Sequence, residues 1–181
     1  MTNKQQTKLY LFLKTNTEYY EIVKEILEHP EMIKRQKFVH HESCSVYDHC
    51  LMVSIFSYLW AKRLNWDYRS AAIGGLLHDF YDEPWQTSDH KLIEKKKKFR
   101  EKHGFVHARQ AAKNAALYFP DLIDEKIDNI IRRHMFPLNI TPPKYREAWI
   151  VTMVDKYSSM DVFKCPKAWP KYLGLSRNRQ S

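Results

Sequence analysis

The sequence predicts a single all-α domain, a helical bundle, over residues 1–181. Three observations favour this fold class. Only four glycines and eight prolines occur in 181 residues, and so few chain-breaking residues suit long helices joined by short turns. Apolar residues make up 44% of the chain and aromatic residues 14%, which is enough to build a packed core at this length. Apolar residues also recur at helical spacing in most segments.

The bundle core is expected at about residues 45–160. Residues 1–40 form an N-terminal helical extension, in which Thr17 is typical of a helix N-cap and Pro30 marks a joint. Residues 165–181 form a loose basic tail. We find no internal repeat and no boundary that would divide the chain into two domains.

The first core helix is predicted to begin after Ser45, which resembles the cap of a capping box, and to run to about Leu64. This segment is apolar on most sides, which is typical of a buried helix. His49 therefore points inward, one turn from the start of the helix. Taken alone, His49 is more typical of a core histidine than of a metal ligand.

The second core helix is predicted to be capped by Asp67 and to end on the adjacent side chains of His78 and Asp79. Gly74 and Gly75 lie within it. Each glycine costs roughly 1 kcal/mol relative to alanine in a helix interior, so the pair indicates close approach of another helix. The His49 helix is the expected neighbour, and this contact would bring His49 near His78.

Three further helices complete the prediction. His103-Gly104 precedes a helix from about 105 to 119, and Pro120-Asp121 opens the next helix, with His134 on its buried stripe. The last helix runs from about 145 to 162 and carries Asp155 inside an apolar segment. A buried carboxylate is costly unless it is paired or binds metal.

Four histidines and two aspartates thus lie at polar breaks in apolar segments: His49, His78, Asp79, His103, His134 and Asp155. Imidazole and carboxylate groups are the ligands of Fe, Mn, Zn and Ni sites. This ligand set is too large for one catalytic ion that must also bind water and substrate, but it suits two ions. Asp79, which adjoins His78, is the natural bridging carboxylate.

The order His49, His78-Asp79, Asp155, with helices between, resembles the HD superfamily of metal-dependent phosphohydrolases. His103 and His134 resemble the additional ligands of its dinuclear branches, which include diadenosine-polyphosphate hydrolases and cyclic-dinucleotide phosphodiesterases. The matching segments are Leu76-Leu77-His78-Asp79, His103-Gly104-Phe105-Val106-His107-Ala108, Ile131-Arg132-Arg133-His134 and Val154-Asp155-Lys156.

The resemblance implies an HD-type helical bundle in which His49, His78, Asp79 and Asp155 hold one ion, while Asp79, His103 and His134 hold the other. His107 is the alternative to His103. We favour His103, because the family's third histidine lies just before a helix with a glycine near it, and His107 then lines the pocket. One difference is the segment after Asp79: many relatives have glycine or alanine and then lysine, whereas this chain has Phe80-Tyr81-Asp82.

The implied reaction is hydrolysis of a phosphoester or phosphoanhydride bond, with a nucleotide as the expected substrate. The expected nucleophile is a hydroxide held between the two ions, because a bound ion lowers the pKa of water toward about 7. The hydroxide attacks phosphorus, and His78 and Asp79 are the residues expected at the reacting centre. Arg133, beside Arg132, and Lys156 adjoin the ligands and are candidates to bind phosphate. Asp82 is a candidate general acid or a supporting partner of a ligand, although a loop-capping role is favoured over both. The ions are expected to be divalent transition metals such as Fe or Mn, with Mg or Zn as further options.

The charge and composition of the chain limit the kinds of partner and the cell compartment that we expect. The net charge of +9 suits a polyanionic small substrate or nucleic acid, and we rank nucleic acid second. The run Lys95–Lys98 is interpreted as solvated surface. Three cysteines without a CxxC pair indicate a reducing compartment, and Cys50 is interpreted as a packed thiol. The absence of a signal peptide or membrane span leads us to expect a cytoplasmic protein. A homodimer is left open.

Three rival functions remain. The first is a mononuclear HD nucleotidase that uses only His49, His78, Asp79 and Asp155. The second is a catalytically silent HD module that binds a nucleotide or RNA through its basic surface. The third is an oxygenase on a related di-iron helical scaffold, which we rank last.

Overall fold

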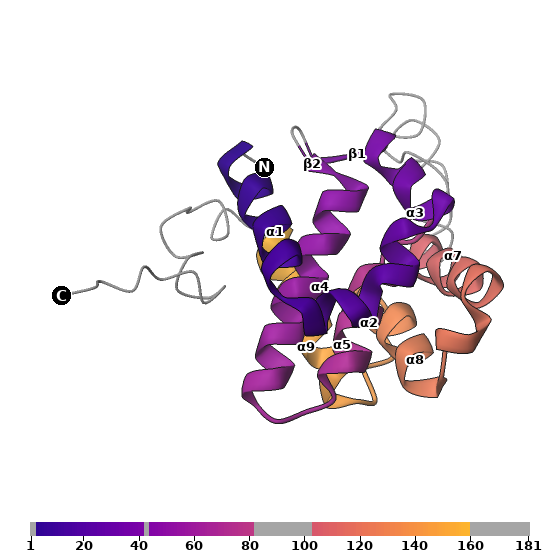
Figure 1. Cartoon of the computed structure of the whole chain (residues 1–181). Helices are drawn as coiled ribbons and strands as arrows, with labels where there is room; N and C mark the ends of the chain where they lie inside the picture. Colours follow the sequence, from indigo (N-terminus) through magenta and orange to yellow (C-terminus); the bar gives the residue numbers. More distant parts are fainter. Residues whose placement is uncertain (1–2, 42–43, 82–102, 160–181) are drawn as a thin grey trace.

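The computed structural model describes residues 3–41, 44–81 and 103–159, and within these ranges the chain is a bundle of α-helices, as the sequence predicts (Figure 1). The elements are α1 (Asn3–Thr15), α2 (Thr17–Glu28), α3 (Pro30–Lys34), the 3₁₀ turn η1 (Arg35–Lys37), β1 (Val39–His41), β2 (Cys44–Ser45), α4 (Val46–Arg63), α5 (Tyr68–Leu77), α7 (His103–Tyr118), the 3₁₀ turn η3 (Pro120–Leu122), α8 (Glu125–Arg133) and α9 (Arg146–Ser159).

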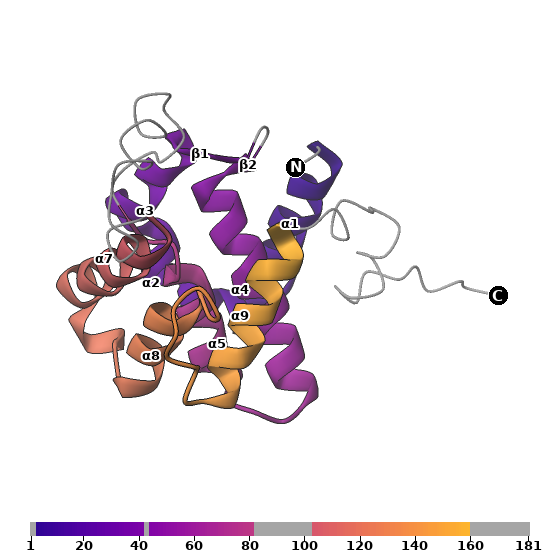
Figure 2. The same ribbon diagram turned by 180° about the vertical axis from the view of Figure 1, so that it is seen from behind.

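Helix α4 forms the centre of the bundle. It begins where predicted, because the Ser45 hydroxyl accepts a hydrogen bond from the backbone N–H of Asp48 at 3.0 Å. Nearly all of its residues as far as Tyr58 are buried, which explains why its sequence is apolar on most sides. Helices α5 and α9 pack directly against it, while α7 and α8 lie together on the far side of α5 (Figures 1 and 2).

The two glycines of α5 allow close contact with two different helices. A Cβ atom on Gly75 would lie 3.0 Å from the backbone Cα of Ser54 in α4, so the predicted approach of these helices is observed. A Cβ atom on Gly74 would instead lie 2.6 Å from Cγ2 of Ile130 in α8. The second contact was not predicted. Together the glycines allow α4 and α8 to approach two different faces of the helix that ends at His78.

The N-terminal helices cover α4 through both apolar and polar contacts. Leu9 and Phe12 of α1 are buried in the core. The carboxylate of Asp48, itself buried, accepts hydrogen bonds from the Gln6 side chain at 2.8 Å and from the Tyr10 hydroxyl at 3.3 Å. Helix α1 is therefore attached to the first turn of α4, one residue from His49.

Several predicted boundaries differ from the structure. Helix α2 is capped by Asn16, whose side chain accepts from the backbone N–H of Tyr19 at 2.9 Å, so Thr17 is the first helical residue. Pro120 opens a 3₁₀ turn, and α8 begins only after Asp124, which caps it by accepting from Ile127 N–H at 2.7 Å. The short hairpin β1–β2 was not predicted. The predicted tail and Lys95–Lys98 lie outside the described residues.

Asp67 caps α5 as predicted, and its removal is expected to destabilise the fold. Its carboxylate accepts from Ser70 N–H at 3.0 Å and from the Lys126 ammonium at 2.7 Å. Burial raises the pKa of Asp67, but the hydrogen bonds from Lys126 and Ser70 lower it by a larger amount, so the net shift of the pKa is downward. Asp67→Ala should therefore lower the free energy of unfolding by about 1 kcal/mol at neutral pH, as measured by urea denaturation.

The sign of the pH dependence follows from this lowered pKa. The carboxylate contributes fully above the ordinary aspartate pKa of about 4, and its contribution is lost as the pH falls through the lower pKa of the folded state. The difference between wild type and Asp67→Ala should shrink in that acid range. Asp67→Asn keeps the cap but loses the charge, so it separates the cap from the pair with Lys126. A difference that stays constant with pH would contradict this account.

Candidate metal centre

Imidazole and carboxylate side chains from five helical segments meet in the interior of the bundle. Each of them lies at or near a helix end or on a buried helix face. The side chain of Asp155 is 13% exposed, and the others are less than about one-tenth exposed. Their positions are His49 in the first turns of α4, His78 and Asp79 directly after α5, His107 in α7, His134 directly after α8, and Asp155 in α9.

The first group of side chains consists of His49, His78, Asp79 and Asp155. The Nε2 atoms of His49 and His78 lie 3.2 Å apart. Oδ2 of Asp79 lies 3.8 Å from His49 Nε2 and 3.6 Å from His78 Nε2. Oδ1 of Asp155 lies 3.2 Å from His49 Nε2 and 3.6 Å from His78 Nε2. Two ligand atoms that each sit about 2.1 Å from one ion are roughly 3.0–3.5 Å apart, so these separations are close to those of a metal site.

The second group consists of Asp79, His107 and His134. The Nε2 atoms of the two histidines lie 3.1 Å apart, and Oδ1 of Asp79 lies 3.4 Å from His107 Nε2 and 3.5 Å from His134 Nε2. Asp79 therefore faces the first group with one carboxylate oxygen and the second group with the other. The rings of His78 and His134, with centroids 4.9 Å apart, bring the groups into contact.

The ends of α5 and α8 determine which nitrogen of each terminal histidine faces the centre. Nδ1 of His78 lies 2.8 Å from the carbonyl oxygen of Gly75, and Nδ1 of His134 lies 2.7 Å from that of Ile131. The last carbonyls of a helix have no partner within it and can accept these Nδ1–H groups. When Nδ1 carries the hydrogen, the lone pair of Nε2 points at the carboxylates, and a cation between them satisfies both.

The electrostatics of the groups also fit a cation. Burial lowers the pKa of His78, but the charges of Asp79 and Asp155 outweigh it and raise this pKa to about 9. Burial alone would raise the pKa of Asp155, yet hydrogen bonds from His49 and His78 hold it well below the usual value. Burial and the neighbouring His78 lower the pKa of His134 to about 3, so its ring is neutral. The Asp155 carboxylate thus stays ionised and attracts positive charge.

The structure places His107, the alternative ligand, in the second group. His103 is the first residue of α7, one helical turn earlier, and its side chain lies outside the described part of the structure. Residues at i and i+4 share a helix face, so both histidines satisfy the same sequence pattern. The ring of Tyr81 packs edge-on against the ring of His107 at 5.8 Å and helps to fix it.

The predicted substrate-binding residues are less completely placed. Arg133, the last residue of α8, is half-buried beside His134, while Lys156 of α9 is exposed beside Asp155. Burial lowers the pKa of Lys156, although the charge of Asp155 opposes this effect. Arg132 is bound to Asp128 through its Nε at 2.7 Å. Asp82 lies outside the described residues.

Two buried residues next to the centre have structural roles. Cys50 is fully buried, and burial together with the charge of Asp79 raises the pKa of its thiol well above the usual value, which agrees with a packed thiol. The guanidinium carbon of Arg35 lies 3.7 Å from the centre of the Phe80 ring, which anchors the chain directly after Asp79. Sequence reasoning missed Arg35 because it lies in a polar segment without an apolar pattern.

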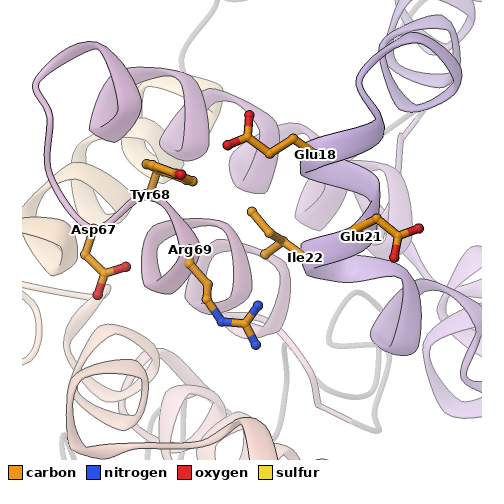
Figure 3. Close-up of a pocket in the computed structure, with 6 residues that line it drawn as sticks. All are labelled: Glu18, Glu21, Ile22, Asp67, Tyr68 and Arg69. Carbon is orange, nitrogen blue, oxygen red and sulfur yellow. The ribbon is translucent and has the colours of Figure 1, made fainter.

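A separate surface hollow of about 510 Å³ lies at the opposite end of α5 (Figure 3). It is lined by Glu18, Glu21, Asp67 and Arg69, among others. At about 1.5 Å per residue, the ten residues of α5 place this hollow roughly 15 Å along the helix from His78. Each of its carboxylates forms an ion pair with a lysine: Glu18 with Lys62, Glu21 with Lys24, and Asp67 with Lys126. The charges lining the hollow are therefore neutralised by lysines, which is typical of a protein surface and not of a metal site.

Comparison with protein families agrees with this geometry. The model of the HD domain matches residues 46–160, more than half of the 181-residue chain, and the chain therefore belongs to the HD domain family. HD domains bind divalent metals, and the family in general consists of metal-dependent hydrolases that act on small phosphorylated substrates. Two sets of buried side chains could hold such an ion, since the ligand atoms within each set all lie within 4.8 Å of one another: His49, His78 and Asp79, and Asp79, His107 and His134.

No curated protein and no solved structure matches the chain. Within the described ranges, no helix combines the length and apolar character that crossing a membrane would require.

Proposed function

We propose that this HD domain is a phosphohydrolase with two divalent metal ions, which cleaves a phosphoester or phosphoanhydride bond of a small phosphorylated substrate, most favourably a nucleotide. The observation that supports two ions is the position of Asp79. Its Oδ2 lies within 3.8 Å of two imidazole nitrogens on one side, and its Oδ1 lies within 3.5 Å of two others on the opposite side. One carboxylate can thus serve both groups.

In this proposal His49, His78, Asp79 and Asp155 would hold the first ion, and Asp79, His107 and His134 would hold the second. His107 replaces His103 in the second group, because its Nε2 lies 3.4 Å from Asp79 Oδ1. The imidazole-rich ligand sets favour transition metals such as Fe or Mn over Mg. When bound, such ions supply a water of lowered pKa and neutralise negative charge on phosphoryl oxygens.

The contribution of the chain itself is to keep the ligands in place and to orient the substrate. Backbone carbonyls of Gly75 and Ile131 hold the rings of His78 and His134 with Nε2 toward the centre. Arg133 and Lys156 adjoin ligands from α8 and α9, and we propose that they contact phosphate groups that do not react. Arginine suits this role because its planar group can bind two phosphate oxygens at once.

Metal analysis of the purified full-length chain, combined with phosphate release from a panel of nucleotides, tests the proposal. Two ions per chain together with hydrolysis of at least one nucleotide are expected. One ion per chain would overturn the dinuclear centre and leave the mononuclear nucleotidase. Nucleotide or RNA binding that weakens steeply with salt, without phosphate release from any substrate, would overturn catalysis and favour a binding module.

A further inference from the structure

His49 differs from His78 and His134 in its position on its own helix. His78 and His134 each follow the last residue of a helix, where carbonyl oxygens without helical partners accept their Nδ1–H groups. His49 instead lies near the beginning of α4, four residues after the cap Ser45. Carbonyls at the beginning of a helix are already used by N–H groups further along it. A group from another part of the chain can therefore serve as the partner of the Nδ1–H of His49.

Helix α9 supplies a group at this position. Oγ of Ser158 lies 3.5 Å from Nδ1 of His49, near the outer limit of a hydrogen bond. The same hydroxyl donates its hydrogen to the carbonyl oxygen of Asp155 at 2.6 Å. Because its single hydrogen is committed to that carbonyl, the hydroxyl presents a lone pair to His49, and the imidazole must be the donor. This fixes Nδ1 as the protonated nitrogen, so that Nε2 carries the lone pair that can bind a cation.

We infer that Ser158 is a positioning residue for the metal centre, which sets the tautomer and ring orientation of His49 and links this ligand to the helix that carries Asp155. The inference rests on the proposed metal centre. Ser158 lies one turn after Asp155 on α9, and His49 Nε2 lies 3.2 Å from Asp155 Oδ1. One hydroxyl thus links the His49 ring of α4 to the backbone of Asp155 in α9, two helices that pack against each other.

The test is a Zn²⁺ titration of metal-free full-length protein, since Zn²⁺ is also suitable for NMR. Loss of a group that orients a histidine ligand typically weakens metal binding about 10- to 100-fold. Ser158→Ala is expected to weaken one binding step by this factor and to leave the other step within about threefold, since the second group does not contact Ser158. Ser158→Thr, which keeps the hydroxyl, should restore the affinity. Were the wild type to bind one ion, that single step should weaken.

A matched control and a spectroscopic signal separate positioning from general loss of structure. Ser57→Ala removes a serine hydroxyl that is buried in α4 and makes no hydrogen bond within the described residues, and it should not alter Zn²⁺ affinity. In the Zn²⁺-loaded wild type, the Nδ1 proton of His49 should be visible and protected from solvent exchange in ¹H–¹⁵N spectra, and this protection should be lost in Ser158→Ala.

Two results would overturn the inference, and they differ in what they say of the proposed function. Unchanged affinity and unchanged protection in Ser158→Ala, with normal binding by the wild type, would exclude the role of Ser158 and leave the metal centre intact. Failure of the wild type to bind any Zn²⁺, Mn²⁺ or Fe²⁺ would overturn the metal centre and the inference together.

Discussion

Asp79→Asn is expected to release both metal ions of the proposed centre and to abolish the proposed hydrolysis. The substitution keeps the size of the side chain but removes its negative charge, which faces four imidazole Nε2 atoms at 3.4–3.8 Å. An asparagine nitrogen placed toward either group would also direct a donor at a cation. We expect metal content below one ion per chain by elemental analysis and a fall in kcat of roughly 10³-fold or more, equivalent to about 4 kcal/mol.

Asp48→Asn is the matched control for this prediction. Asp48 is also a buried aspartate, but its carboxylate is bound by Gln6, Tyr10 and Ser45 and not by the histidine groups. Its substitution should weaken the attachment of α1 and leave the metal content at the wild-type value. Retention of both ions by Asp79→Asn would show that Asp79 is not the shared ligand.

Gly74→Ala is expected to have the second large effect: it should destabilise the fold and thereby weaken metal binding. The added Cβ would lie 2.6 Å from Cγ2 and 2.9 Å from Cβ of Ile130, both close to the backbone of α8 on a stiff β-branched side chain. Helix α8 must then move away from α5. Overpacking of this kind costs about 1–3 kcal/mol, which outweighs the gain of at most about 1 kcal/mol in helix propensity.

The measurement is urea denaturation of the single and double variants of Gly74 and Ile130. Ile130→Ala removes the atoms at 2.6 Å and 3.0 Å, so the double variant should be more stable than the sum of the two single changes predicts. Because His134 follows α8 directly, Gly74→Ala should also weaken metal binding to the second group. Strict additivity, or an increase in stability from Gly74→Ala alone, would contradict the observed packing.

Most of the helices could be predicted because their caps and periodicity are local signals. Ser45 and Asp67 bind backbone N–H groups within three residues, and the sequence alone indicates both. The errors arise where two local signals compete. Asn16 and Thr17 are both good caps, and Pro120 fits the first turn of a 3₁₀ helix as well as that of an α-helix. The hairpin β1–β2 has too few residues to produce an alternating pattern.

The candidate centre could be predicted in composition but not in every position. His49, His78 and His134 each lie on a buried stripe that periodicity reveals, and Asp155 is conspicuous in an apolar segment. The choice between His103 and His107 depends on how far α7 advances along its axis, which periodicity cannot determine. Ser158 was not predicted because its role depends on the contact between α4 and α9, about one hundred residues apart in sequence.

The attachment of α1 to α4 bears on how much of the polypeptide is needed for a stable HD domain. The family match begins at residue 46, whereas the side chains that bind Asp48 come from Gln6, Tyr10 and Ser45, all upstream of it. A truncated protein that starts at residue 46 would lose the cap of α4 and expose the apolar surface now covered by Leu9 and Phe12. The folded unit that contains the HD domain of this protein therefore extends beyond the residues matched by the family, back to its first helix.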